Sequence, residues 1–231
     1  MVKQGNFTVE LILADTKAPF QEHTGPDGKV YAEVEPDAEY FIRVKNEHPT
    51  GVIIVKFKVD GDDLGYQGQM KPGNEDSYGL FSLKDGKETN QALRLQKASV
   101  MDCAADADDK PWTGCAEVCF FQGISGHITT QNDGEGKWGG GKVGILLGGE
   151  HAKKGVKSGA GSIFEIKEVQ KRRKTMAYSK GEVLGTIKLY YCTAVGLIFA
   201  GVLPKPPAWD LHRMLYPRKE EENKVKPELI S

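Results

Sequence analysis

Hydrophobic and polar residues alternate through most of the segment 30–68. Apolar side chains recur at every second position in 30–34, 40–44 and 53–59, and a period of two is typical of strands with one buried face. Asp60-Gly61 follows the third run and is a hairpin turn signal. The pattern therefore predicts an antiparallel β core. The predicted buried residues are Val30, Val34, Tyr40, Ile42, Val44, Ile53, Val55, Phe57 and Val59.

Shorter apolar runs predict further strands before and after this segment. The predicted strands cover 7–13, 64–69, 78–83, 116–122 and 163–169. The run 89–101 has fewer apolar positions, so it predicts either a strand or one helical turn.

The most apolar stretch is Gly185–Leu203. A bilayer-spanning helix needs about 20 apolar residues, but Lys188 leaves only the fifteen residues from Leu189 to Leu203. We therefore expect one or two buried closing strands and no membrane span. Pro204, Pro206 and Pro207 then end the domain.

Glycine is dense from residue 123 to 162, apart from the apolar run 143–147. Glycine weakens strands and raises the entropy cost of ordering the chain, so this region is predicted to be a long insertion. The expected fold is an all-β antiparallel sandwich, jelly-roll or immunoglobulin-like, over 1–203. Residues 204–231 are expected to form an extended C-terminal arm.

Charge is balanced overall but not along the chain. The 231 residues carry a net charge of −1, with −7 in residues 1–110 and +6 in residues 111–231. The split reflects either chance with a basic tail, or two surfaces that meet different partners. The small total charge gives no field that would steer the protein to nucleic acid or membrane. The first 17 residues lack the apolar core of a signal peptide, so an intracellular protein is expected, cytoplasmic or, if viral, in the virion.

Three patterns come close to a ligand site without completing one. Gly136–Val143 lacks the hydroxyl residue that a phosphate-binding loop needs after its lysine. Cys103, Cys115, Cys119 and His127 could be drawn as a zinc site, but without the usual paired spacing. The aspartates at 60, 62 and 63 and at 106, 108 and 109 lack the spacing of a calcium loop. We predict no metal, no cofactor and no disulfide among the four cysteines, the fourth being Cys192.

No serine or cysteine lies in a recognisable nucleophile motif with a histidine base, so the chain is predicted not to be an enzyme.

The basic run 171–174 is a localisation signal, a phosphate contact or a solvated turn. Beyond the prolines, a cluster of apolar residues is spaced to lie along one side of a short helix. The predicted partner-binding residues are Lys171, Arg172, Arg173, Lys174, Trp209, Leu211, Met214, Leu215 and Tyr216.

Five motifs support a family resemblance. They are VELILAD, YAEVEPDAEYFIRV, VDGDDLGYQ, FSL and LGTIKLYY. Over residues 7–83 and 184–192 the chain resembles an uncharacterised β-sandwich domain family of eukaryotic microbes. The resemblance implies a sandwich and no particular activity.

The leading functional hypothesis is a structural or adaptor component that binds protein subunits of a larger assembly. One concrete form is a minor structural protein of a large virus particle, because sandwich folds are common there. The alternative is a carbohydrate-binding or hydrolytic β-sandwich, which a concave face with exposed aromatic residues or paired carboxylates would favour.

Overall fold

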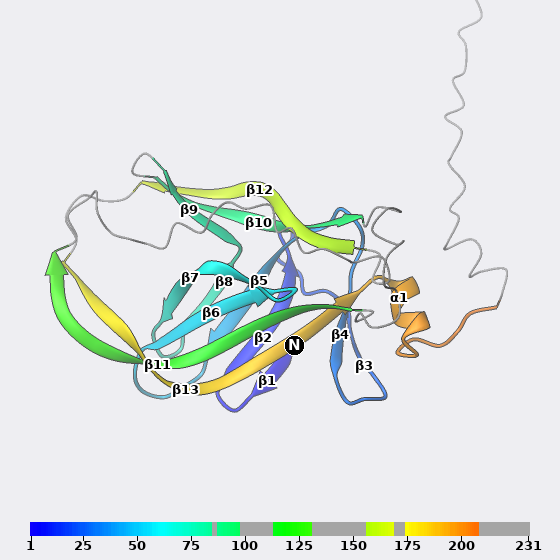
Figure 1. The fold of residues 1–231 in the computed structure, drawn as a ribbon, viewed down its shortest axis with the longest axis horizontal. Helices are drawn as coiled ribbons and strands as arrows, with labels where there is room; N and C mark the ends of the chain where they lie inside the picture. Colours follow the sequence, from blue (N-terminus) through cyan, green and yellow to red (C-terminus); the bar gives the residue numbers. More distant parts are fainter. Residues whose placement is uncertain (85–86, 98–112, 131–155, 169–173, 208–231) are drawn as a thin grey trace, which may run out of the picture.

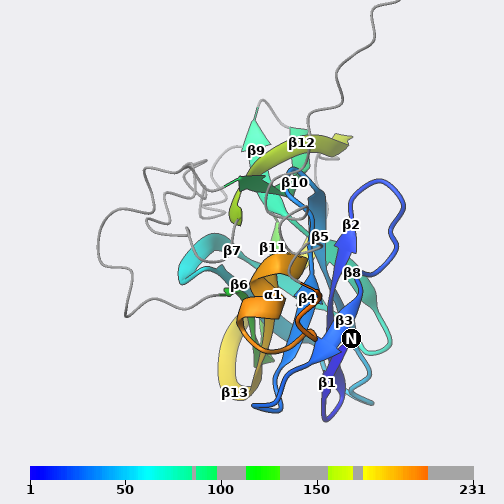
Figure 2. The same cartoon turned by 90° about the vertical axis from the view of Figure 1, so that its right-hand side faces the viewer.

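The strands form two sheets that face one another (Figure 1). The computed structural model describes residues 1–84, 87–97, 113–130, 156–168 and 174–207. Sheet A has the order β1-β2-β5-β10-β12, with β8 paired to β5 and β9 paired to β10. Sheet B has the order β3-β4-β13-β11-β6-β7. Figure 2, viewed from the end that carries helix α1, shows the two sheets as two layers.

The strands have the following bounds. Sheet A contains β1 (Val2–Gln4), β2 (Phe7–Leu13), β5 (Glu39–Asn46), β8 (Glu75–Tyr78), β9 (Leu80–Lys84), β10 (Lys87–Lys97) and β12 (Val156–Glu168). Sheet B contains β3 (Glu22–Thr24), β4 (Val30–Glu33), β6 (Ile53–Val59), β7 (Asp62–Met70), β11 (Gly114–Thr130) and β13 (Lys174–Cys192). Helix α1 is Ala194–Phe199. Of the strand pairs in the described part of the chain, only β4 with β13 is parallel.

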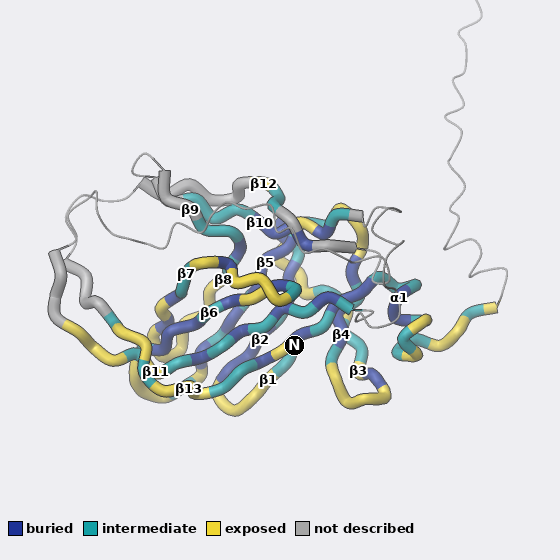
Figure 3. The backbone as a smooth tube through the Cα atoms, in the orientation of Figure 1, coloured by how far each residue is buried: buried dark blue, intermediate teal, exposed yellow. Residues whose placement is uncertain are grey.

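The predicted all-β sandwich is confirmed, and its core lies between the sheets. Every predicted core residue except Val30 is buried, and Val30 is partly buried against the same cluster. Figure 3 shows the buried positions concentrated where the sheets overlap. Apolar side chains at alternate positions of each strand point to this space, and their removal from water is the main term that stabilises the fold.

The consecutive strands β4, β5 and β6 do not pair with one another. β4 and β6 belong to sheet B, whereas β5 belongs to sheet A and pairs with β2. The chain therefore crosses between sheets twice within thirty residues. The predicted Asp60-Gly61 hairpin does form between β6 and β7, with φ angles of 55° and 92°, as a two-residue hairpin turn requires.

The prediction of closing strands is right for residues 185–192, which lie in β13, and wrong for 194–199. Those residues form α1. The Thr193 side chain accepts a hydrogen bond from the Gly196 N–H at 3.3 Å and caps the helix. Leu197 is buried with Tyr31 and Cys192 on the outer face of sheet B, so the apolar run covers the sheet from outside.

The predicted insertion over 123–162 stays a prediction, but its two ends are strands. Residues 123–130 continue β11, and residues 156–162 belong to β12. Cross-strand hydrogen bonds there outweigh the low strand propensity of glycine. Residues 131–155, which include the near-miss phosphate loop and the apolar run 143–147, lie outside the described residues.

Candidate interaction surface

The longest strand pair extends beyond the sandwich. β11 and β13 pair from Gly114 with Tyr191 to Thr130 with Lys174. On its other side, β11 is paired with β6 only from Ala116 to Gln122. We call residues 123–130 of β11 and 174–184 of β13 the ribbon. Figure 1 shows it curving away from the sheets at the end opposite to α1.

Irregular pairing accompanies the bend. Phe120 pairs with Gly185 and Phe121 with Val183, so Leu184 is an extra residue in β13. Between Phe121 and Gly123, which pairs with Lys180, β13 again has one residue more than β11. An extra residue in one strand bends it and increases its twist. Two bulges in succession explain why the ribbon leaves the plane of sheet B.

Apolar side chains are exposed on the ribbon. Val183 is 65% exposed, Ile124 51% and Leu184 41%. The other exposed large apolar residues of the described chain are Met1 and Phe199. Alternation from the buried Phe120 places Ile124 on the side that continues the core face, while Val183 lies opposite Phe121 on the outer side. The ribbon therefore presents apolar groups on both faces.

Two local contacts hold side chains on the ribbon. The Lys180 ammonium lies 4.7 Å from the centre of the Phe121 ring. Ile124 packs over Gly181, where a Cβ would lie 2.9 Å from Ile124 Cδ1. A cation over an aromatic face contributes about 0.5–1 kcal/mol at an exposed site. Such contacts shape the ribbon but do not bury its apolar surface.

Much of the outer edge of β13 has no partner strand among the described residues. β4 pairs with β13 only at Tyr190, Tyr191 and Cys192, and β1 lies beside β13 where Gln4 approaches Gly185. From Tyr178 to Leu184 no other described strand pairs with this edge. Unpaired edge amides and carbonyls are a template for pairing with another chain.

A cluster of polar side chains lies inside the sandwich and links the two sheets. Ser158 Oγ in β12 is 2.8 Å from the Tyr40 hydroxyl and 2.7 Å from the Tyr191 hydroxyl. The Tyr191 hydroxyl donates to Asp60 Oδ2 at 2.7 Å, and Asp60 Oδ1 accepts from the Cys115 N–H at 3.0 Å. Burial raises the pKa of both tyrosines above the usual range, so both hydroxyls keep their protons at neutral pH. The chain of hydrogen bonds satisfies buried polar groups and is structural.

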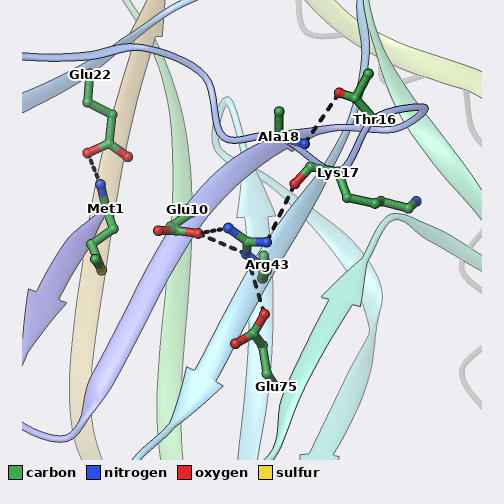
Figure 4. A network of polar contacts seen from close by, with 8 residues as sticks. All are labelled: Met1, Glu10, Thr16, Lys17, Ala18, Glu22, Arg43 and Glu75. Carbon is green, nitrogen blue, oxygen red and sulfur yellow. Dashed lines mark hydrogen bonds and ion pairs between the residues drawn. The ribbon is translucent and has the colours of Figure 1, made fainter.

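Ion pairs cover the outer face of each sheet. On sheet B, Lys58 and Lys188 flank Glu117 at 3.7 and 3.2 Å. Partial burial alone would raise the pKa of Glu117, but hydrogen bonds from Lys188 and Cys119 and the nearby Lys58 charge lower it. On sheet A, Arg43 pairs with Glu10 and lies 3.6 Å from Glu75 (Figure 4). Neutralised pairs of this kind are typical of a solvated sheet face.

The structure brings together few of the residues singled out from the sequence. Lys171, Arg172 and Arg173, and the tail cluster from Trp209 to Tyr216, lie outside the described residues, as does Cys103. Lys174 begins β13 and the ribbon. Cys115, Cys119 and Cys192 carry thiols. Within the described parts of the chain, no three His, Cys, Asp or Glu residues are grouped to hold a metal.

The ribbon itself was missed from the sequence. Its strand residues 174–184 contain two lysines, a glycine and a glutamate and only a weak alternation, so no apolar face indicated a strand. The available signal was the length of the segment between the basic run and the apolar stretch, which is enough for a strand of its own.

Comparisons with known proteins found no match to any protein-family model, curated protein or solved structure. The resemblance to an uncharacterised sandwich family therefore stays a prediction. None of the helical segments that the structure describes has the length and apolar character to cross a membrane.

Proposed function

We propose that this protein is a non-enzymatic structural or adaptor component of a larger protein assembly, and that the ribbon is its main contact with a partner subunit. The observation that carries the proposal is the ribbon's combination of exposed apolar residues and a strand edge that no other strand of the described chain pairs with.

Energetics support this role. A two-stranded ribbon is only marginally stable in water without a third strand or a packed face. Val183 and Ile124 are more than half exposed and Leu184 is 41% exposed, although β13 continues directly into the core. Covering apolar surface contributes roughly 25 cal/mol for each Å² removed from water. A partner that packs against the ribbon would therefore gain binding free energy and stabilise the two paired strands.

The rival function has less support from the described residues. A carbohydrate-binding sandwich would present exposed aromatic rings on a strand face. Among the aromatic side chains whose exposure the structure describes, only Phe199 is exposed, and it lies on α1 rather than on a sheet. The narrower identification as a virus structural protein rests on fold analogy, and the tail cluster is a second predicted contact; both stay predictions.

Native-mass purification of the tagged full chain from its source tests the proposal. The unmodified chain should migrate in a complex, and the double substitution Val183→Lys and Leu184→Lys should release the partner subunits. The control, Phe199→Lys, changes an exposed apolar residue at the opposite end and should leave the complex intact. A complex unaffected by the ribbon substitutions, in a variant with an unchanged melting temperature, would contradict the proposed contact.

A further inference from the structure

We infer that strand β12 restrains the ribbon, and that two side-chain ties to the rest of the sandwich determine how firmly β12 itself is held. The inference rests on the proposed function, because it concerns the regulation of the ribbon contact. It comes from the order of the strands along the chain and from the hydrogen bonds that β12 makes beyond its backbone ladder.

β12 lies between the two strands of the ribbon in the sequence. The chain leaves the ribbon at Thr130, forms β12 from Val156 to Glu168, and enters the ribbon again at Lys174. Glu168 and Lys174 are six positions apart, so the far end of the ribbon stays within roughly 20 Å of the end of β12. As long as β12 is paired with sheet A, the ribbon is therefore tethered to the sandwich at both of its ends.

The backbone ladder of β12 is irregular. Among the described strands β12 pairs only with β10, at the edge of sheet A. Between the pairs Gln91–Ile163 and Leu93–Ala160, β12 has one residue more than β10. A bulge of this kind disrupts the ladder locally and leaves a residue without its cross-strand partner. The ladder therefore holds β12 less firmly than an unbroken one would, and side-chain contacts gain importance.

The first tie lies at this bulge. Glu39 Oε1 in β5 accepts hydrogen bonds from the N–H and from the hydroxyl of Ser162, both at 2.9 Å. Gly161 allows the close approach, because a Cβ at this position would lie 3.1 Å from the Glu39 carboxyl carbon. The carboxylate thus takes the place of a ladder partner, and a charged acceptor makes a stronger hydrogen bond than a neutral one.

The second tie is made by Ser158, the one buried side chain among those of β12 that the structure describes. Tyr191 donates its hydroxyl proton to Asp60. Since each hydroxyl has a single proton, Ser158 donates to Tyr191, and Tyr40 donates to Ser158. All three hydrogen bonds therefore run toward the Asp60 carboxylate. Loss of the Ser158 hydroxyl would leave two buried tyrosine hydroxyls each short of one hydrogen bond, so this contact holds β12 against both sheets.

These contacts make β12 a unit that can open before the core does. Proteins open locally in cooperative units whose free energies lie below that of global unfolding. When β12 opens, the ribbon keeps its own ladder but loses the tether at its far end. A docked β12 therefore keeps the ribbon in one position, which lowers the entropy cost of binding a partner.

Native-state hydrogen exchange on the purified full chain tests the inference. Glu39→Gln and Ser158→Ala should each speed exchange of the β12 amides several-fold, and the double variant should speed it about tenfold or more, because each change weakens one tie. Ribbon amides should exchange faster in the same variants, whereas amides of β2 and β6 should keep their rates. Glu10→Gln is the matched control. It changes a partly buried carboxylate of sheet A that accepts from Arg43, and it should leave β12 and the ribbon unchanged.

Three results would overturn the inference: unchanged β12 exchange in the double variant, faster β12 exchange with an unchanged ribbon, or an equal rise in every strand. If Ser158→Ala does not fold, Glu39→Gln alone decides among the same outcomes, because its side chain lies at the edge of the sandwich. Exchange is measured without a partner. The inference can therefore fail while the substitutions at Val183 and Leu184 still release partner subunits, and the proposed contact can fail while β12 and the ribbon still open together.

Discussion

Strand β13 has two parts that differ in environment although both pair with β11. In the part from Ile187 to Tyr191, alternate side chains are buried in the core and the fold closes over them. In the part from Tyr178 to Leu184, backbone pairing continues but no second layer of the described chain buries the side chains. The comparison shows that a hydrogen-bonded ladder sets the path of a strand, whereas burial of side chains provides most of its stability.

The largest expected contrast is between a charge placed in the core and the same charge placed on the ribbon. Val55 in β6 is fully buried, and Val55→Asp would place an unpaired carboxylate between the sheets. That costs several kcal/mol, comparable to the whole stability of a domain, so the variant should not fold. Val183→Asp, at a position that is 65% exposed, should melt like the unmodified protein. Thermal unfolding followed by circular dichroism measures both, and a folded Val55→Asp variant would contradict the assigned core.

A smaller contrast comes from two glycines. A Cβ at Gly114 would lie 2.2 Å from the Tyr191 ring, and this ring is fully buried. Overpacking in a core costs about 1–3 kcal/mol, so Gly114→Ala should lower the free energy of unfolding by at least this much. A Cβ at Gly181 would lie 2.9 Å from the half-exposed Ile124 side chain, which can move aside, and 3.1 Å from the Gln122 backbone oxygen, a close but less severe contact. Gly181→Ala should therefore lower the free energy of unfolding by less than Gly114→Ala does; equal losses in both variants would mean that the ribbon is packed as tightly as the core.

The smallest contrast concerns one tyrosine hydroxyl in each part. Tyr191→Phe removes the hydroxyl between Ser158 and Asp60, and an unsatisfied buried polar group costs about 1–3 kcal/mol. Tyr178→Phe in the ribbon should be neutral in unfolding experiments at low protein concentration.

The pH dependence sharpens this prediction. Burial raises the pKa of Tyr191 and Tyr40 in the folded chain above about 10, the usual tyrosine value. The unfolded chain then loses these protons first, so stability should be level from pH 7 to 9 and fall as the pH rises above about 10. The fall should be shallower in Tyr191→Phe. A fall of the same steepness would show that the buried hydroxyl does not couple folding to pH.

Side-chain alternation was enough to identify most strands, and nearly all of the core residues predicted from it are buried in the structure. Val34, Ile42 and Phe57 are buried because alternate residues of a strand point to one face, whatever the strand pairs with. It could not identify α1, because a short apolar run is compatible with a strand or a helix and the cap at Thr193 is a single residue.

The sequence by itself determined that this chain is a β-sandwich, where its turn at Asp60-Gly61 lies, and that the strand at 53–59 has one buried face. These features depend on neighbours within a few residues. Only the tertiary structure decided that β4, β5 and β6 alternate between sheets, that β11 and β13 extend beyond the core, and that Tyr40, Ser158 and Tyr191 meet inside it. Those features include a hydrogen bond between Tyr40 and Ser158, which are 118 residues apart in the sequence. Pairing over such separations depends on how all strands share one core, which no local pattern contains.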